Sequence, residues 1–225
     1  MEEKLKIVFE NKNLLLVNKM AGMITTKERK GEKGTLEDLL IQERGRNSLA
    51  RQGIVHRLDK GTSGLILIAK NEESLNKLKN QFKKREVIKK YICLVEGDSS
   101  KQGSIKVPIG RSKYNFAKFR VGVGGKEAWT EFKKIGMYKK DGKIYSLLEI
   151  NLKTGRSHQI RVHMSYLGWP LVGDKNYGGK INDLKRPFLQ AKFISFKEPI
   201  NGKKMSFEVD LADDLKEVLK NCEEV

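Results

Sequence analysis

The sequence predicts a single α+β domain built on a largely antiparallel β-sheet with flanking helices. Short apolar segments recur along the chain and are separated by turns rich in Gly, Asn and Lys, which is typical of antiparallel strands. Helical spacing of apolar residues is confined to a few segments between them. With 225 residues, 38% of them hydrophobic, the chain is long enough to bury a substantial core. We therefore expect residues 1–225 to form one domain.

The first predicted elements are a hairpin and a short helix. Leu5–Glu10 and Leu14–Asn18 are apolar segments joined by an Asn-Lys-Asn turn, which predicts a β-hairpin. Thr35 and Asp38 have the spacing of a capping pair, which predicts a helix after Thr35. The polar, Gly-containing residues 27–34 predict a mobile loop.

The stretch Gly53–Lys70 places charged residues next to a buried strand. Leu65–Ala69 is an unbroken apolar run without helical period, which predicts a strand buried on both faces. Arg57 and Asp59 come just before it, and residues two apart in an extended segment point to the same side. The Lys-Gly-Thr-Ser-Gly turn that follows can hold Asp59 at the edge of the core. From these residues alone, Asp59 is either an active-site acid or an Asp that caps its own turn.

The following segments complete the expected sheet. Asn71 can cap a helix that runs to about Arg85 with an apolar stripe on one face, and Val87–Val95 reads as a β-branched and aromatic strand. Further strands are predicted at Ile105–Val107, Phe116–Val121, Ala128–Ile135 and Ile144–Leu152. The tail predicts two more strands and a short amphipathic helix that begins at Asp213.

A second informative stretch runs from Leu152 to Gly178. Ser157 can cap a helix in which Ile160 and Met164 face the core. Arg161 follows Ile160 by about 100° around the helix axis, so it flanks the core rather than facing open water. An arginine in this place needs a carboxylate partner, because an unpaired buried charge costs about 3–5 kcal/mol.

The chain carries a strong excess of positive charge. Lys and Arg number 46 against 28 Asp and Glu, which gives a formal net charge of +18. Such an excess indicates a polyanionic partner, most often nucleic acid, while a solubilising surface and an anionic membrane are the alternatives. No apolar run approaches the width of a bilayer, and the N-terminus lacks the pattern of a signal peptide.

The cysteines and histidines do not form a metal-binding pattern. Cys93 and Cys222 are far apart, which favours reduced thiols in a cytoplasmic protein. On a helix His158 and His163 would lie about 140° apart around the axis, which is poor geometry for one ion. We expect these histidines to be hydrogen-bonded parts of the structure, and we expect no bound metal.

Both informative stretches resemble segments of one enzyme family. His-Arg-Leu-Asp at residues 56–59, followed by Thr-Ser-Gly at residues 62–64, resembles the signature segment of the RluA-type RNA pseudouridine synthases. Residues 152–178 match a second segment of that family, and weaker agreement covers nearly the whole chain. The resemblance implies the pseudouridine synthase fold, a largely antiparallel mixed β-sheet with flanking helices and a central basic cleft.

The resemblance also implies which residues act on the RNA. In the family the aspartate of the first segment is the essential catalytic residue, and it corresponds to Asp59. The arginine two residues earlier, here Arg57, helps to displace the target base, and the neighbouring His56 is assigned to the same RNA-binding part of the site.

The resemblance implies two further residues of the site. A family tyrosine that lies against the target uracil is matched by Tyr91. The arginine that forms an ion pair with the catalytic aspartate is matched by Arg161, so we expect an Arg161–Asp59 pair. Arg156 is the competing arginine for this role, and an ordinary buried tyrosine is the alternative for Tyr91.

The activity that the resemblance implies is isomerisation of specific uridines to pseudouridine in structured RNA, either ribosomal RNA or tRNA. The reaction breaks the bond from ribose C1′ to N1 of a base turned out of the helix and rejoins the base through C5, so it needs no cofactor. Asp59 could attack C1′ or remove a ribose proton. Tyr91 could act as a base or as a stacking platform.

Two alternatives belong to other functional classes. A non-catalytic RNA-binding protein needs only positive charge, and binding to a polyanion gains nothing from a carboxylate in the cleft. A metal-dependent nuclease would need paired acidic ligands around Asp59, which the sequence lacks. We expect a monomeric cytoplasmic enzyme that does not contact membranes. Because the chain begins directly with the hairpin, we also expect no separate N-terminal RNA-binding module.

Overall fold

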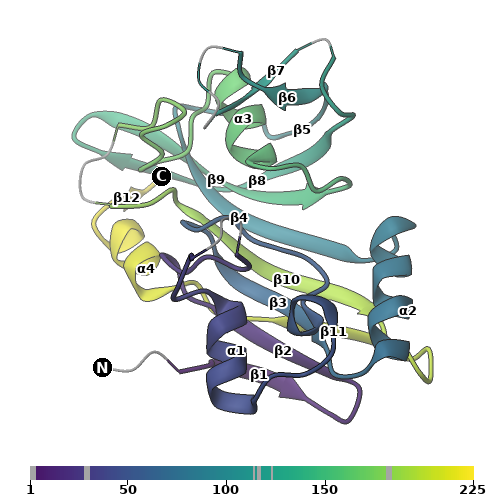
Figure 1. Ribbon diagram of the computed structural model, residues 1–225. Helices are drawn as coiled ribbons and strands as arrows, with labels where there is room; N and C mark the ends of the chain where they lie inside the picture. The colour runs from purple at the N-terminus through teal and green to yellow at the C-terminus, as the bar shows by residue number, and fades with distance from the viewer. Residues whose placement is uncertain (1–3, 28–30, 114, 116–117, 123, 181–183) are drawn as a thin grey trace. The chain divides into compact units, whose positions relative to one another are not determined.

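The chain forms two structural units, and each unit is made of two separate segments of the sequence. Unit 1 comprises Met1–Ile88 and Ala191–Val209, and unit 2 comprises Lys89–Gln190 and Asp210–Val225. This computed structural model describes residues 4–27, 31–113, 115, 118–122, 124–180 and 184–225 (Figure 1). Residues 28–30 of the predicted mobile loop and residues 116–117 of one predicted strand lie outside the described residues.

Unit 1 contains a sheet in which β3 is an inner strand. The strands of this unit are β1 (Ile7–Glu10), β2 (Leu14–Lys19), β3 (Ser63–Ala69), the part of β10 (Leu189–Lys197) that begins at Ala191, and β11 (Lys204–Glu208). Hydrogen bonds give the order β1-β2-β3-β10, and β11 pairs with β10. The predicted N-terminal hairpin is confirmed as the antiparallel pair β1–β2. Every residue of β3 is buried, so the prediction of a strand covered on both faces is also confirmed.

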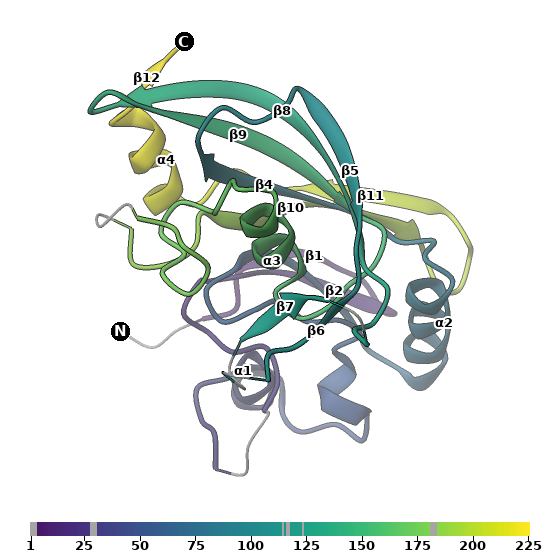
Figure 2. The same cartoon turned by 90° about the horizontal axis from the view of Figure 1, so that it is seen from above.

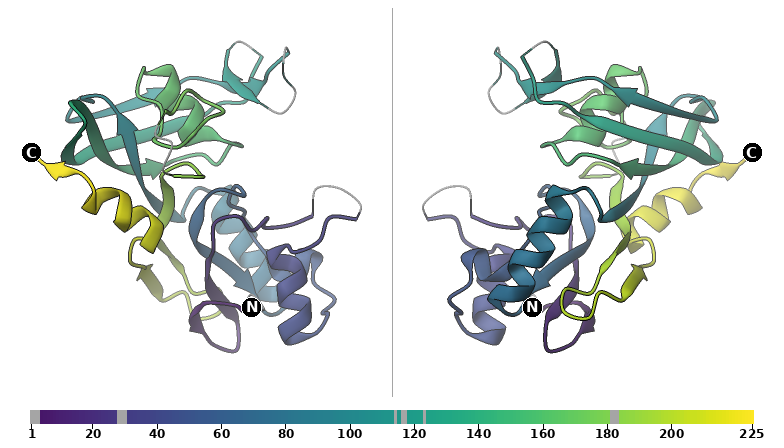
Figure 3. Two further views of the ribbon diagram at one scale, coloured as in Figure 1. Left: turned by 90° about the vertical axis from the view of Figure 1, so that its left-hand side faces the viewer. Right: turned by 90° about the vertical axis from the view of Figure 1, so that its right-hand side faces the viewer.

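Two helices of unit 1 begin at the predicted caps. At the start of α1 (Leu36–Arg44), Thr35 Oγ1 accepts a hydrogen bond from the Asp38 N–H, and Asp38 Oδ2 accepts one from the Thr35 N–H. Asn71 caps α2 (Glu72–Lys83) by accepting from the Ser74 N–H. Figure 3 shows α2 beside the strands of unit 1. Its buried leucines, Leu75 and Leu78, belong to a cluster that also contains Leu14, Leu16, Leu49, Leu65, Leu67, Ala69, Val87, Ile194 and Phe196.

Unit 2 contains a second run of antiparallel strands. They are β4 (Ile88–Glu96), β5 (Gln102–Lys106), β8 (Trp129–Lys140), β9 (Lys143–Leu152) and β12 (Glu223–Glu224). Their order is β4-β9-β8-β12, with β5 also paired to β8. A separate two-stranded ribbon joins β6 (Ile109–Arg111) to β7 (Phe119–Val121). In Figure 2 the long hairpin β8–β9 arches over helix α3 (Gln159–Tyr166).

Helix α3 begins later than the sequence predicts. His158, not Ser157, occupies the N-cap position, and its side chain makes no capping hydrogen bond. The His158 backbone is left-handed, with φ 55° and ψ 20°, a conformation that interrupts a right-handed helix. The helix therefore starts at Gln159, and the expectation of a Ser157 cap is wrong.

The C-terminal helix α4 (Asp213–Lys220) is anchored to unit 2 by a polar side chain and by an apolar one. Gln190 donates from Nε2 to the Asp210 carbonyl and accepts the Ala212 N–H on Oε1. Leu215 is buried in a cluster with Ile92, Leu94, Tyr145, Val172, Leu184 and Phe188. The predicted amphipathic helix is therefore confirmed.

The predicted fold class is confirmed, with some corrections to individual strands. β6 and β12 are not predicted from the sequence because they contain three and two residues, too few to show an alternating pattern. β8 continues beyond the predicted end at Ile135, and its register shifts between Lys134 and Gly136. A bulge of this kind breaks the alternation on which a strand prediction depends.

Candidate active site

The loop that carries Asp59 is held between two backbone contacts that only glycine permits. A Cβ atom on Gly53 would lie 2.0 Å from the Ala69 carbonyl oxygen, and one on Gly64 would lie 2.1 Å from the Ala191 carbonyl oxygen. Both glycines also have positive φ, 84° and 117°. The two ends of the loop are therefore fixed by close backbone approaches within unit 1, Gly53 to the last residue of β3 and Gly64 to β10.

Within this loop the side chains alternate as the sequence predicts. Leu58 is buried, Arg57 is exposed, and Asp59 is half-buried. The Asp59 carbonyl accepts a hydrogen bond from the Thr62 N–H at 3.0 Å, which closes the turn before β3. Asp59 therefore lies on a structured turn and is partly exposed to solvent.

His56 is tied to the sheet and to α2. Its Nε2 accepts the Leu67 N–H at 3.0 Å, and its ring stacks on Phe82 with centroids 4.8 Å apart. An accepting Nε2 places the proton of a neutral ring on Nδ1. These contacts fix the backbone one residue before Arg57.

Tyr91 lies in β4 of unit 2, opposite Ile150 of β9, and is 7% exposed. Cys93, two residues on, is fully buried, and burial raises the pKa of its thiol, so it is a structural thiol. Lys89, two residues before Tyr91 on the same strand, is half-buried. Burial lowers the pKa of Lys89.

Lys89 also lies next to the loop that precedes α3. A Cβ atom on Gly155 would lie 3.9 Å from the Lys89 ammonium nitrogen. Sequence reasoning missed this lysine, although its alternation with Tyr91 places the two side chains on one face of β4.

Arg161 has a buried carboxylate partner within unit 2. Its Nε donates to Asp174 Oδ2 at 2.6 Å and its Nη2 donates to Asp174 Oδ1 at 2.8 Å. The Asp174 side chain is 1% exposed and the Arg161 side chain is 8% exposed. The sequence analysis did not identify Asp174, and the Gly-Asp pair in the second motif was the available signal. The expected Arg161–Asp59 pair joins residues of different units and stays a prediction.

Tyr177 links Arg161 to the β6–β7 ribbon. The Arg161 guanidinium lies 4.8 Å from the centre of the Tyr177 ring, a cation–π distance. The Tyr177 hydroxyl oxygen accepts the Phe119 N–H at 2.9 Å and lies 2.8 Å from His158 Nδ1. One side chain therefore contacts β7, the N-cap of α3 and the arginine on α3.

His163 takes a structural role in unit 2. Its Nδ1 lies 2.8 Å from Thr130 Oγ1 and its Nε2 lies 3.0 Å from the Val107 carbonyl oxygen, so the ring donates from Nε2 and accepts at Nδ1. Burial lowers the pKa of His163, and the bond to the Val107 carbonyl partly offsets this effect. Among the described residues no group of three or more His, Cys, Asp or Glu is arranged to hold a metal ion.

Arg156, the competing arginine, has a different environment. Its Nε donates to the Glu127 carbonyl at 2.9 Å, and its backbone N–H donates to Gln159 Oε1 at 3.0 Å. Gln159 in turn donates from Nε2 to the Trp129 carbonyl and to Thr130 Oγ1. Arg156 is thus part of the network that joins the start of α3 to β8.

Comparison with known proteins identifies one family. A family model described as RNA pseudouridylate synthase matches residues 13–166. The uncharacterized RNA pseudouridine synthase YlyB of Bacillus subtilis is 39% identical over 223 residues, which cover 96% of this chain and 72% of that protein. Ribosomal large subunit pseudouridine synthase D of Pseudomonas aeruginosa is 34% identical over 226 residues, which cover 94% of this chain and 69% of that protein.

Solved structures show the same similarity. Human RNA Pseudouridylate Synthase Domain Containing 1 aligns with 100% of this chain and 92% of its own, with a TM-score of 0.80 and 26% identity. Human RNA Pseudouridylate Synthase Domain Containing 4 aligns with 96% of this chain and 92% of its own, with a TM-score of 0.75 and 21% identity. The second likeness supports the fold alone. No helix among the described residues has the length and apolar character needed to cross a bilayer.

Proposed function

Since the chain belongs to the family of RNA pseudouridylate synthases, we propose that it converts specific uridines to pseudouridine in structured RNA. The resemblance to RluA-type enzymes is confirmed, and the chain is an RNA pseudouridine synthase, an isomerase. The observation that carries the proposal is the family match over residues 13–166, which includes Asp59, Tyr91 and Arg161. Ribosomal RNA is the first target to test, because several relatives are named for the large ribosomal subunit, and tRNA is the second.

The proposed reaction conserves every atom of the nucleotide. The bond from C1′ to N1 breaks, the uracil turns, and a bond from C1′ to C5 forms. C5 then loses its proton and N1 gains one. No electron is gained or lost overall, and no group is transferred to another molecule, so the reaction requires no co-substrate.

Asp59 is the residue proposed to act at the ribose. It either attacks C1′ or removes a ribose proton, and either role needs a carboxylate whose backbone does not move. The glycine contacts and the closed turn around this residue support that role. Arg161 is proposed to pair with Asp59 during the reaction, and a guanidinium can donate to two carboxylates because it has five N–H donors. Tyr91 is proposed to lie against the uracil as a platform or as a base.

Arg57 is proposed to help the target base leave the helix. Its exposed, planar cation can insert where a base has unstacked, and enzymes that act on a base take it out of the stack. His56, whose ring is fixed by Leu67 and Phe82, is proposed to support RNA contact at Arg57. The net charge of +18 supports binding to the phosphate backbone.

We propose one catalytic domain formed by both units, acting as a cytoplasmic monomer without a bound metal or cofactor. The interleaved course of the chain supports one domain, because neither unit is a continuous segment of the sequence. The free thiols of Cys93 and Cys222 support a reducing compartment.

The test is direct analysis of pseudouridine. RNA from a strain that lacks this protein, and unmodified transcripts of ribosomal RNA and tRNA, would be incubated with the purified chain and with an Asp59→Asn variant. The modified positions would be mapped by carbodiimide labelling and primer extension, since pseudouridine has the same mass as uridine. New sites that require Asp59 would support the proposal. RNA binding without new sites in any of these RNAs would favour a non-catalytic RNA-binding protein.

A further inference from the structure

The residue just before Asp59 is held by a single buried hydroxyl. Thr25 Oγ1 accepts a hydrogen bond from the Leu58 N–H at 3.1 Å and donates one to the Leu58 carbonyl at 2.8 Å. Thr25 is 1% exposed and Leu58 is 4% exposed. Buried backbone N–H and C=O groups need partners, and one side chain supplies a partner for both groups of Leu58. All of these residues belong to unit 1.

The residue just after Asp59 is held by the same short segment. The Gly22 N–H donates to the Lys60 carbonyl at 2.8 Å. Residues 22–25 therefore bond to the neighbours of Asp59 on both sides. The carboxylate is placed by hydrogen bonds to its neighbours in addition to its own turn.

This segment is itself fixed to two elements of unit 1. The ammonium group of Lys19, which is 2% exposed, donates to the carbonyls of Met20 and Met23, both at 2.8 Å. At the other end, the Leu36 N–H donates to the Ile24 carbonyl at 2.8 Å and the Glu37 N–H donates to the Thr25 carbonyl at 3.2 Å. The segment therefore runs from the end of β2 to the first turn of α1 with a bond at each end.

We propose that Thr25 is a positioning residue for Asp59: its hydroxyl sets the backbone on which the catalytic carboxylate is carried. This inference rests on the proposed function of Asp59 and adds a residue outside both motifs. Loss of the hydroxyl leaves the Leu58 N–H and carbonyl buried without that partner. The backbone around Leu58 then has to move to find another hydrogen-bond partner. A movement of about 1 Å at a reacting group is enough to slow a reaction by about a hundredfold.

The test compares Thr25→Val with Thr25→Ser in the full chain. Valine keeps the branched shape and removes the hydroxyl, whereas serine keeps the hydroxyl. Single-turnover rates at saturating enzyme report the chemical step, and Kd reports RNA binding. We expect Thr25→Val to lower the rate about tenfold or more while Kd stays within about twofold, and we expect Thr25→Ser to recover most of the rate.

Asn71→Ala is the control for a general loss of stability. It removes the cap of α2, which follows the C-terminal end of β3, whereas Asp59 precedes the N-terminal end of that strand. It does not alter residues 22–25 or 58–60. It should lower the unfolding temperature and leave the single-turnover rate unchanged. If Thr25→Val and Asn71→Ala slow the reaction equally, or if Thr25→Ser is as slow as Thr25→Val, the positioning role is wrong.

A second measurement separates this inference from the proposed function. Amide hydrogen exchange should show the Leu58 N–H protected in the parent chain and in Thr25→Ser, and exchanging faster in Thr25→Val. A parent chain that forms no pseudouridine in any RNA would overturn the proposed function. Equal Leu58 protection in the parent and Thr25→Val would instead overturn the role of Thr25, because its hydroxyl would not hold that peptide.

Discussion

Arg161 and Asp174 form a buried, two-pronged ion pair, with Nε–Oδ2 at 2.6 Å and Nη2–Oδ1 at 2.8 Å. Both hydrogen bonds are charge-assisted, and the paired geometry fixes the plane of the guanidinium as well as its position. The arginine proposed to pair with Asp59 is therefore already oriented by a different carboxylate from its own unit. In the proposed mechanism Asp174 orients the Arg161 guanidinium, and Asp59 acts on the uridine.

Removing Asp174 should destabilise the protein strongly. Asp174→Ala leaves the Arg161 guanidinium in a buried position without this carboxylate, and we expect a loss of about 3–5 kcal/mol in the free energy of unfolding. The measurement is urea unfolding of the parent and the variant. Glu208→Ala is the control, because Lys192 Nζ binds Glu208 at 2.9 Å but the two side chains are 34% and 59% exposed. That variant should lose only about 1 kcal/mol. Equal losses in the free energy of unfolding would show that burial of Asp174 does not increase its contribution to stability.

Asp59→Asn should separate catalysis from folding and binding. The amide keeps the size of the side chain and removes its charge, together with its ability to attack C1′ or accept a proton. We expect a folded protein that binds RNA within a few-fold of the parent and forms no detectable pseudouridine. The measurements are thermal unfolding, RNA affinity and site mapping. A folded Asp59→Asn protein that modified its RNA at a rate near that of the parent would remove Asp59 from the mechanism.

Arg161→Ala should differ from Asp59→Asn in stability. Both variants should be inactive, but Arg161→Ala also leaves Asp174, which is 1% exposed, without its guanidinium partner. We expect its free energy of unfolding to fall by about 3–5 kcal/mol. Urea unfolding beside the activity assay checks both parts of this expectation. An Arg161→Ala protein as stable as the parent would mean that water or another cation replaces the guanidinium.

Arg57→Ala should lose more activity on structured RNA than on flexible RNA. Extruding a base costs a few kcal/mol in a helix and least where the base is already unstacked. The measurement is the rate of modification of one target sequence presented in a hairpin and in an unstructured strand. Lys60→Ala removes an exposed positive charge on the other side of Asp59 and serves as the control for charge alone. If Arg57→Ala slowed both substrates equally, Arg57 would not act on base extrusion.

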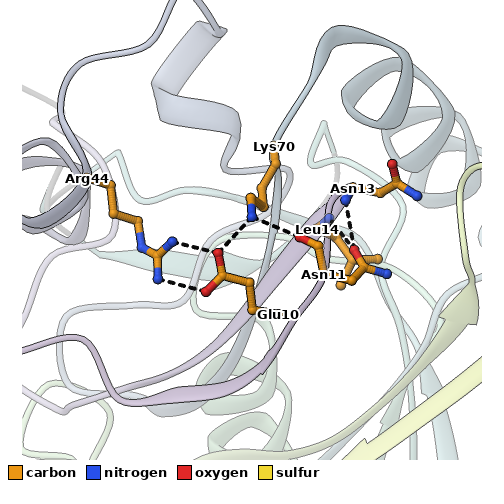
Figure 4. Close-up of polar contacts among 6 residues, drawn as sticks. All are labelled: Glu10, Asn11, Asn13, Leu14, Arg44 and Lys70. Carbon is orange, nitrogen blue, oxygen red and sulfur yellow. Dashed lines mark hydrogen bonds and ion pairs between the residues drawn. The ribbon is translucent and has the colours of Figure 1, made fainter.

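Glu10 should contribute stability that depends on pH. Its carboxylate accepts hydrogen bonds from Arg44 at 2.6 and 2.9 Å and from Lys70 at 2.7 Å (Figure 4). The Arg44 bonds, followed by the Lys70 bond, lower the pKa of Glu10 from 4.5 to about 2. Because the folded pKa is the lower one, this stabilisation is present above pH 4.5 and is lost as the pH falls towards 2.

Glu10→Gln removes the charge that makes this contribution. Its free energy of unfolding should lie below that of the parent near pH 6, by no more than about 1 kcal/mol because the group is partly exposed, and the difference should vanish near pH 2. Glu73→Gln, which breaks the exposed pair with Lys77, is the control and should change little. A difference between the parent and Glu10→Gln that stayed constant from pH 6 to pH 2 would contradict the assignment.

Local patterns predicted much of the fold because the information lay within a few residues. The Thr35–Asp38 pair marks the start of α1, Asn71 marks the start of α2, and the apolar run of β3 shows a strand buried on both faces. The turn that follows Asp59 could likewise be predicted from the glycines within it. The chemical roles in the sequence analysis came from the family resemblance.

The features that were missed depend on residues far apart in the sequence. Asp174 contacts Arg161 across 13 positions within the second stretch, and Thr25 contacts Leu58 across 33 positions of the chain. Serine is a common capping residue, which is why Ser157 was predicted as the cap. The His158 backbone is left-handed and its ring hydrogen-bonds to Tyr177, so the helix starts after His158. The alternation or helical spacing of a single element does not show which residues of other elements it contacts.

The divided course of the chain affects how unit 1 is made during synthesis. β3 is buried throughout and lies between β2 and β10, and the unit 1 part of β10 begins at Ala191. The ribosome must add all of Lys89–Gln190 before that strand exists, which takes about 5–20 s at roughly 5–20 residues per second. During this interval an apolar strand edge has no native neighbour on one side. The nascent chain therefore passes through a stage that is prone to aggregation, in which protection by chaperones or by the ribosome surface matters most.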